Sequence, residues 1–173
     1  MATIKDVFVP SSYQTYIDAV KEEDLLIALK KSTKRGKALL GSISEKKSKY
    51  AYAEDKWTLK ELLQHMIDAE RVFVYRALRF ARKDHTPLPG FDENTWAPNS
   101  RANERKWKEM LKELMVLRES TIRFFESLGE DQLNQRGISN NNEINVIGIG
   151  FVCAGHLTHH LKIIRQRYLK SGK

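Results

Sequence analysis

Three histidines have the spacing and the surroundings of metal ligands. The segment His156-Leu157-Thr158-His159-His160 reads as helix, and it contains an HxxxH pair formed by His156 and His160. Residues four apart on a helix lie on the same face, so both imidazoles can point at one ion. A third imidazole, His65, lies far upstream on the apolar face of another helical segment. Three histidines that leave a fourth position open are the ligand set of a catalytic-type zinc or nickel site.

Taken singly, each of these histidines is more typical of a core residue than of a ligand. Three histidines at similar depth on apolar helix faces change that interpretation, because unpaired imidazole nitrogens in an apolar core cost on the order of a few kcal/mol. A metal satisfies one nitrogen on each ring, and Asp68 or Glu70 is a candidate acceptor for the remaining N–H groups. His159 competes for the second ligand position, but it is rotated by about 60° from His156 and is expected at the rim or behind the ligands.

The helix with the HxxxH pair carries no general base. Residue 157 is Leu, where the HExxH motif of metallopeptidases has its Glu. The sequence has no GxSxG, P-loop or dinucleotide fingerprint, although composition alone leaves a Ser/His/Asp arrangement open. Cys153, one turn before His156, could lend a thiolate, but we favour a small buried apolar side chain.

Helices with one apolar stripe each are expected to position these residues. Four long segments have this periodicity, approximately Glu22–Ile43, Thr58–Arg82, Asn99 or Ser100 to Ser127, and Val146–Lys170. The second begins with a capping box, in which Thr58 caps the helix and Glu61 reaches back to its amide. Because four such helices bury their stripes against one another, the sequence predicts an all-α four-helix bundle.

The connections between these helices differ in length and composition. Pro87, Pro89 and Gly90 end the second helix, and the irregular stretch that follows to Pro98 is too long for a tight turn. The chain is therefore expected to cross over the bundle between the second and third helices. A polar loop is expected over 129–142. We find no internal repeat or boundary, so 1–173 is expected to form a single domain, with 1–21 as an extension or short helix.

Composition and charge fit a globular protein of the cytoplasm. The chain has 173 residues, of which 41% are hydrophobic, and a lone cysteine that excludes an intrachain disulfide. No apolar run approaches the roughly 20 residues that span a bilayer, and residues 1–6 lack the apolar core and cleavage site expected of a signal peptide. The net charge is +8, but the basic residues are spread along the chain without a groove-reading motif. We therefore favour solvated helix faces over specific nucleic-acid binding, and expect no membrane partner.

Several stretches together resemble the DinB-like (YfiT-type) superfamily of metal-binding four-helix bundles. They cover nearly the whole chain from about Glu22, and their combination is specific although each alone is weak. The matching stretches are Lys56–Glu61 with His65, Ile67–Arg71, Phe73–Phe80, Pro87–Asn94, and Gly155-His156 with His160 and Tyr168. The resemblance implies that His65, His156 and His160 bind a divalent metal such as zinc or nickel. It also implies an up-down-down-up bundle and a homodimer, for which Trp96 and Trp107 near the crossover are candidate contacts.

The function that the resemblance implies is a reaction of a small molecule. Some relatives use low-molecular-weight thiols, which suggests a metal-dependent S-transferase in which the metal lowers the pKa of the thiol. A metal-dependent hydrolase and a non-catalytic metal-binding bundle are the alternatives. Four arginines, Arg71, Arg76, Arg79 and Arg118, are candidates for holding acidic groups of a cosubstrate, but we favour salt bridging for them.

Overall fold

The computed structural model describes residues 2–169 and confirms the helical bundle. Its four long helices are α2 (Leu25–Gly41), α4 (Leu59–Ala81), α6 (Trp107–Glu126) and α8 (Val146–Ile163). The shorter helices are α1 (Gln14–Asp18), α3 (Glu45–Ser48), α5 (Glu93–Asn99) and α7 (Glu130–Leu133). There are 3-10 turns at Ile4–Asp6, Ser11–Tyr13 and Ala102–Glu104, and a π-helical turn at Ile164–Tyr168. Two short strands are present, β1 (Arg136–Ser139) and β2 (Asn142–Asn145). Each helix in this part of the chain is too short or too polar to cross a membrane.

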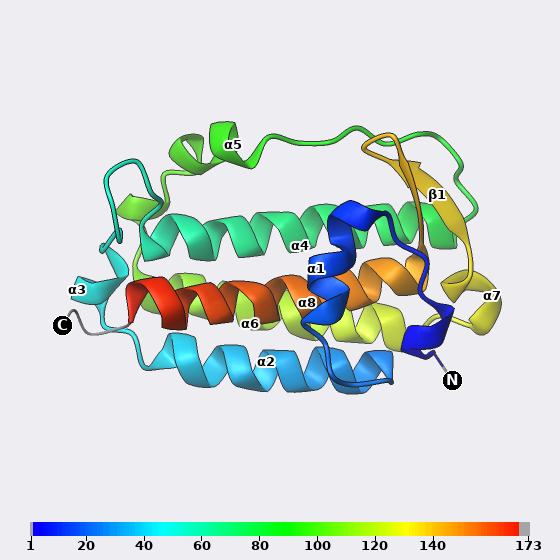
Figure 1. Ribbon diagram of the computed structural model, residues 1–173, viewed down its shortest axis with the longest axis horizontal. Coiled ribbons are helices and arrows are strands. Elements are labelled where there is room, and N and C mark those ends of the chain that lie inside the picture. Colours follow the sequence, from blue (N-terminus) through cyan, green and yellow to red (C-terminus); the bar gives the residue numbers. More distant parts are fainter. Residues whose placement is uncertain (1, 170–173) are drawn as a thin grey trace.

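The long helices run up, down, down and up along the bundle (Figure 1). Helix α8 packs between α2 and α4, and α6 packs against the same two helices from the other side. Helices α4 and α6 run in the same direction, so the connection between them returns along the length of α4 (Figure 1). This topology brings the first half of α4, which carries His65, beside the second half of α8, which carries His156 and His160.

Local sequence signals explain where the long helices begin and how closely they pack. The Asp24 side chain accepts from the Ile27 amide at the start of α2, and the predicted capping box at the start of α4 is present. Gly36 lies where α2 meets α8, because a Cβ there would be 3.3 Å from the Leu157 side chain. The absence of a side chain therefore permits the close approach of these helices.

The third long helix starts later than the sequence indicated. It was expected from Asn99 or Ser100, but α6 begins at Trp107. The crossover has a helix of its own, α5, whose first amides are capped by the Asp92 carboxylate. Arg101 then takes a left-handed backbone conformation, with φ of 53°, which interrupts the helical path.

Two other expectations need correction. The expected polar loop over 129–142 contains α7 and most of a β-hairpin, whose turn residues Asn140 and Asn141 both have positive φ. Asparagine tolerates this conformation better than other non-glycine residues, as tight hairpin turns require. Trp107 is buried and donates its indole N–H to the Leu40 carbonyl at 3.0 Å, so it is not available for a dimer contact. Of the two tryptophans, Trp96 is the exposed one.

The termini of the described chain pack on the bundle. Helix α1, within the segment 1–21 that was expected as an extension or short helix, lies across α8 (Figure 1). A Cβ at Gly155 would lie 2.0 Å from the Tyr16 carbonyl oxygen, so only glycine allows α1 to lie this close to α8. Helix α8 ends at Ile163 and continues as the π-helical turn to Tyr168, whereas Lys170, its expected end, lies outside the described residues.

A buried ion pair joins the centres of all four long helices. Arg118 on α6 is fully buried and donates to the Glu70 carboxylate on α4 at 2.9 Å. The same guanidinium donates to the Cys153 carbonyl on α8 and to Ser32 on α2. Glu70 also accepts from the Thr121 hydroxyl at 2.6 Å. Both charges are thus paired and hydrogen-bonded, which is the condition under which buried charges are tolerated.

Candidate metal centre

Three imidazoles from two adjacent helices meet through their Nε2 atoms. The Nε2 atoms of His65 on α4 and His156 on α8 are 3.0 Å apart. The Nε2 atom of His160, one turn after His156, is 3.1 Å from that of His156. All three nitrogens lie within 4.8 Å of one another. The structure thus brings together the three histidines selected from the sequence, and we refer to them as the histidine triad.

Burial keeps the three rings neutral. It lowers the pKa of His65 to about 4, against an opposing effect of the Glu93 charge. It lowers the pKa values of His156 and His160 well below the usual range, and the neighbouring histidines lower them further. At neutral pH each ring therefore has one nitrogen with a free lone pair, the form in which imidazole binds a metal.

Hydrogen bonds among the three rings cannot satisfy them. A neutral imidazole has one N–H donor and one acceptor nitrogen, whereas the Nε2 atom of His156 faces two other Nε2 atoms. The Nδ1 atom of His160 is buried and has no hydrogen-bond partner within residues 2–169. Nitrogen ligands at about 2.0–2.1 Å from a tetrahedral zinc ion are about 3.3 Å apart, close to the observed separations. The triad therefore fits one small divalent ion.

Aromatic rings surround the triad and restrict the orientation of its imidazoles. Tyr16 of α1 meets His156 edge-on, with ring centroids 5.2 Å apart, and Phe73 does so from α4 at 5.6 Å. The Trp57 ring lies 5.0 Å from that of His65. Such packing holds ligand side chains in place before an ion binds, which is the requirement for a preorganised site.

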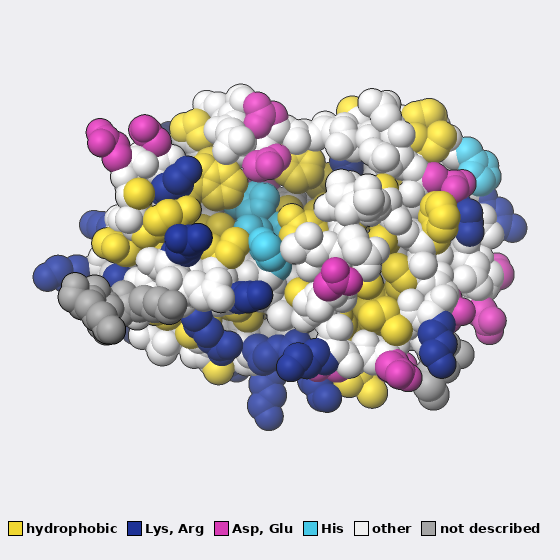
Figure 2. Space-filling view, in the orientation of Figure 1, with side chains coloured by type: hydrophobic (Ala, Val, Ile, Leu, Met, Phe, Trp, Pro, Cys, Tyr) yellow, Lys and Arg dark blue, Asp and Glu magenta, His cyan; other side chains and the backbone are white. Residues whose placement is uncertain are grey.

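A cleft of about 150 Å³ gives access to the triad. Its lining includes two triad members together with aromatic and charged side chains, namely Tyr13, Tyr16, His65, Phe73, Arg76, Phe91, Glu93 and His156. Figure 2 shows histidine side chains at the surface between hydrophobic ones, with acidic side chains beside them on the side of α5. The triad is therefore reachable from outside.

Two ionisable groups of opposite charge line this cleft with the histidines. Glu93, at the start of α5, is exposed. Burial raises the pKa of Tyr16, and the charges of Tyr13 and Glu93 raise it further. Glu93 lines the same cleft as Tyr16 and His65. Arg76 is buried and donates from Nη2 to the Pro89 carbonyl at 2.7 Å. The cleft thus combines a proton acceptor with a fixed positive charge.

The family model of the DinB superfamily matches residues 28–164, a range that includes the whole triad. The chain belongs to the DinB superfamily. No curated protein matches it. Among solved structures it is similar to YfiT from Bacillus subtilis, described as a probable metal-dependent hydrolase with an unusual four-helix bundle topology. The two chains are 14% identical and have a TM-score of 0.69, over 92% of this chain and 90% of YfiT. At this identity the likeness concerns the fold.

The two carboxylates that were expected to accept from the imidazole N–H groups have other partners in the structure. Glu70 is engaged by Arg118 and Thr121 at the bundle centre, and Asp68 accepts from Gln64 at 2.9 Å. Neither carboxylate is hydrogen-bonded to a triad imidazole within the described residues, so the role expected of Glu70 is corrected to that of a structural ion pair. Burial raises the pKa of Asp68, which lines a small gap beside His65.

The other residues considered from the sequence have distinct places in the structure. His159 is partly buried beside Tyr16, with ring centroids 5.4 Å apart, and lies outside the triad. Cys153 is buried, and burial raises the pKa of its thiol well above its usual range, so it offers no thiolate. Of the four arginines considered, only Arg76 lines the cleft. The other three form ion pairs, Arg71 with Asp68 and Glu113, Arg79 with Asp84, and Arg118 with Glu70.

Glu93 and Tyr16 are the site residues that sequence reasoning missed. Glu93 lies in the Pro87–Asn94 stretch that carried the family resemblance, and it follows a capping Asp92 directly. That cap was the available signal for α5, and hence for a carboxylate held on a short helix. Tyr16 belongs to a short helix that precedes the bundle, and the sequence carries no signal for where such a helix packs.

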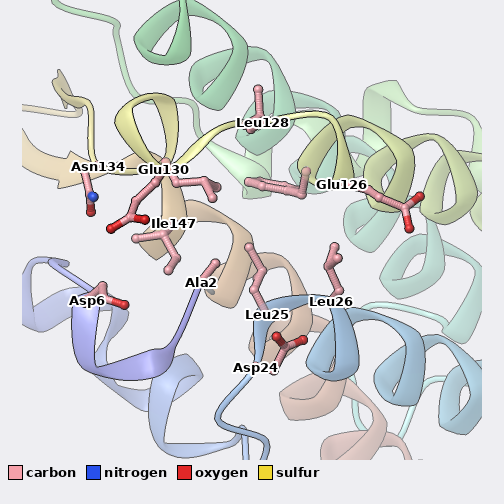
Figure 3. Close-up of a pocket in the computed structure, with 12 residues that line it drawn as sticks. Ala2, Asp6, Asp24, Leu25, Leu26, Glu126, Leu128, Glu130, Asn134 and Ile147 are labelled. Carbon is pink, nitrogen blue, oxygen red and sulfur yellow. The ribbon is translucent and has the colours of Figure 1, made fainter.

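A separate pocket of about 360 Å³ lies where α2 and α8 begin and α6 ends (Figure 3). Acidic side chains from four segments surround it, namely Asp6, Asp24, Glu126 and Glu130. Its lining includes no histidine and no arginine or lysine. It is thus chemically distinct from the cleft at the triad.

Proposed function

We propose that this protein is a metal-dependent hydrolase in which His65, His156 and His160 hold one zinc or nickel ion. The observation that carries the proposal is the Glu93 carboxylate, which lines the same cleft as two triad histidines. A hydrolase needs a base positioned to take a proton from water, and helix α8 supplies none. The crossover supplies one instead, and the wording used for YfiT agrees with this reaction class.

Glu93, Arg76 and the aromatic residues of the cleft each have a role in the proposed hydrolysis. A divalent ion bound by the triad would lower the pKa of an adjacent water or thiol and polarise a substrate oxygen. Glu93 accepts the proton from the attacking water and returns it to the leaving group. The Arg76 guanidinium, fixed by the Pro89 carbonyl, stabilises negative charge that develops on the substrate. The aromatic walls of the cleft exclude bulk water from the reacting atoms.

Thiol S-transfer is the second candidate, supported by the same triad and by Arg76. A three-histidine ligand set is neutral, so the ion keeps its full charge and can hold a thiolate strongly. Arg76 is the one buried arginine of the cleft and could hold a carboxylate of such a cosubstrate. In this case Glu93 is dispensable, because an ion held by His65, His156 and His160 would itself lower the pKa of the thiol. The two candidates therefore differ in their dependence on Glu93.

The test compares both reactions on tag-free protein loaded with zinc or nickel and on chelated protein. Hydrolysis is assayed with an activated ester, an anilide and a phosphodiester, and conjugation with bacillithiol, mycothiol, glutathione and coenzyme A against a monohalobimane. We expect metal-dependent hydrolysis that falls by about 10²- to 10⁴-fold in Glu93→Gln. The matched control is Glu54→Gln, at an exposed glutamate outside the cleft.

Three other outcomes have defined meanings. Metal-dependent conjugation that is insensitive to Glu93→Gln would replace the hydrolase with the transferase. No metal-dependent rate with any of these substrates would contradict both for the classes tested. Equal losses in Glu93→Gln and Glu54→Gln would remove Glu93 from the mechanism.

A further inference from the structure

Another concavity, larger than the triad cleft, also borders α1. It has a volume of about 570 Å³ and is formed by α1, the middle of α2 and the last turns of α8. Its lining is rich in positive charge, from Lys21, Arg35, Lys162 and Arg165, with Asp18 as its only acidic residue. We call this concavity the basic groove.

Most of this positive charge is not neutralised by the protein. Lys21, Lys162 and Arg165 are exposed and form no ion pair within residues 2–169. Asp18 accepts a hydrogen bond from Gln14 at 2.8 Å and pairs with none of the groove cations in the same part of the chain. Three cations around one concavity repel one another, and an anion bound between them would relieve that repulsion.

Arg35 is the fourth basic residue in the lining of the groove. Its Nη1 donates to the Glu22 carboxylate at 3.0 Å. Its Nε is buried and has no hydrogen-bond partner among the described residues. The Arg35 side chain is 38% exposed, so an anion in the groove can reach the guanidinium group but not the buried Nε.

The basic groove adjoins the triad through His159, whose ring also packs against that of His160 with centroids 5.3 Å apart. His159 lines the groove, and its ring packs edge-on against Tyr16 at 5.4 Å. Tyr16 also packs edge-on against His156, with ring centroids 5.2 Å apart. Figure 2 shows lysine and arginine side chains gathered beside the exposed histidines on the same face of the molecule, over α8 and α2.

We propose that the basic groove is a binding site for a small dianion, either a phosphate group or a dicarboxylate. Its volume is within the range of about 300–1,000 Å³ typical of small-molecule pockets. Three unpaired cations and the partly exposed Arg35 guanidinium match a ligand with two negative charges and several acceptor oxygens. The site uses no triad residue, so this proposal does not rest on metal binding or on hydrolysis.

The test follows backbone amide resonances of the full-length protein while inorganic phosphate is added, and in a second titration succinate. We expect saturable shifts at Lys21, Arg35 and Lys162, weaker at physiological than at low salt. Lys21→Gln/Arg165→Gln should weaken binding by about tenfold, the ratio expected for two exposed ion pairs. Lys5→Gln/Lys108→Gln removes the same charge at two exposed lysines outside the groove and should leave the affinity nearly unchanged.

The remaining outcomes overturn the proposal. They are the absence of saturable shifts with both anions, shifts confined to residues around the triad, and equal weakening in the two double variants, which would indicate net charge alone. Tighter binding of a short oligothymidylate through the same three cations would assign the groove to nucleic acid instead. The spectra also report whether each variant is folded, since neither double substitution removes an ion pair of the described chain.

Discussion

The Nε2 atoms of His65 and His156 are 3.0 Å apart although 91 positions separate the two residues in the sequence. This proximity depends on α4 and α8 being neighbours in the bundle, which in turn depends on the crossover that returns the chain along α4. His160 needs no further tertiary contact to join the triad, because it is one helical turn from His156. Local spacing therefore supplies two ligands, and the bundle topology supplies the third.

The buried Arg118–Glu70 pair should be essential for stability. Glu70→Gln removes the charge that compensates Arg118 at the centre of all four long helices. We expect the free energy of unfolding to fall by about 3–5 kcal/mol, as is typical when one partner of a buried pair is removed. Glu126→Gln, which breaks the exposed pair with Arg123, should change it by less than about 1 kcal/mol. Urea denaturation measures both, and equal effects would refute the assigned role.

Glycine at position 155 should be required for α1 to pack on α8. In Gly155→Ala the new Cβ would meet the Tyr16 carbonyl oxygen, a backbone atom that cannot rotate away. We expect a loss of about 2 kcal/mol in the free energy of unfolding and increased amide exchange in 11–18. Gly41→Ala is the control, because its Cβ would be 4.0 Å from the nearest side-chain atom; it should stabilise the protein by about 0.5 kcal/mol. A stable Gly155→Ala protein with protected α1 amides would contradict the contact.

Helical periodicity was sufficient to predict the parts of the fold and site that lie inside long helices. The apolar stripe of α4 places His65 inward, and the four-residue spacing does the same for His156 and His160, so the triad could be selected before its geometry was known. The cap at Thr58 fixed the start of α4 within one residue. These features are local, and local sequence specifies them.

The features that were missed are short elements whose position depends on tertiary contacts. The hairpin strands have four residues each and are joined to the crossover through Leu88, which exchanges backbone hydrogen bonds with Ile138 and Asn140. Helix α5 has seven residues and lies on α4, which brings Glu93 to the cleft. No periodic pattern develops over such lengths. Asn140-Asn141 was nevertheless a signal for the hairpin turn.

Metal-free protein should lose stability in mild acid because its triad is buried in the neutral form. Burial lowers the pKa of all three histidines below the ordinary value of 6.5, to about 4 for His65. The unfolded chain therefore takes up protons below pH 6.5 that the folded chain cannot. The free energy of unfolding is highest above that pH and should decrease as the pH falls from 6.5 toward 4, by up to about 1.4 kcal/mol per pH unit for each histidine.

Urea denaturation of chelated protein at several pH values between 7.5 and 5 measures this dependence. The triple variant His65→Gln/His156→Gln/His160→Gln is the control, because it lacks the three titrating groups but keeps polar side chains of similar size. Its stability should decline less steeply over the same interval. Parallel declines in the two proteins would show that other groups cause the acid sensitivity.

Metal content is the most direct test of the central claim that His65, His156 and His160 form one metal site. Protein purified without a histidine tag is dialysed against zinc or nickel, then against metal-free buffer, and analysed by elemental mass spectrometry. We expect one ion per chain in the wild type and in His159→Ala, since His159 lies outside the triad. The variant His65→Ala/His156→Ala/His160→Ala should retain almost none. Retention of as much zinc or nickel by this triple variant as by the wild type would contradict the account.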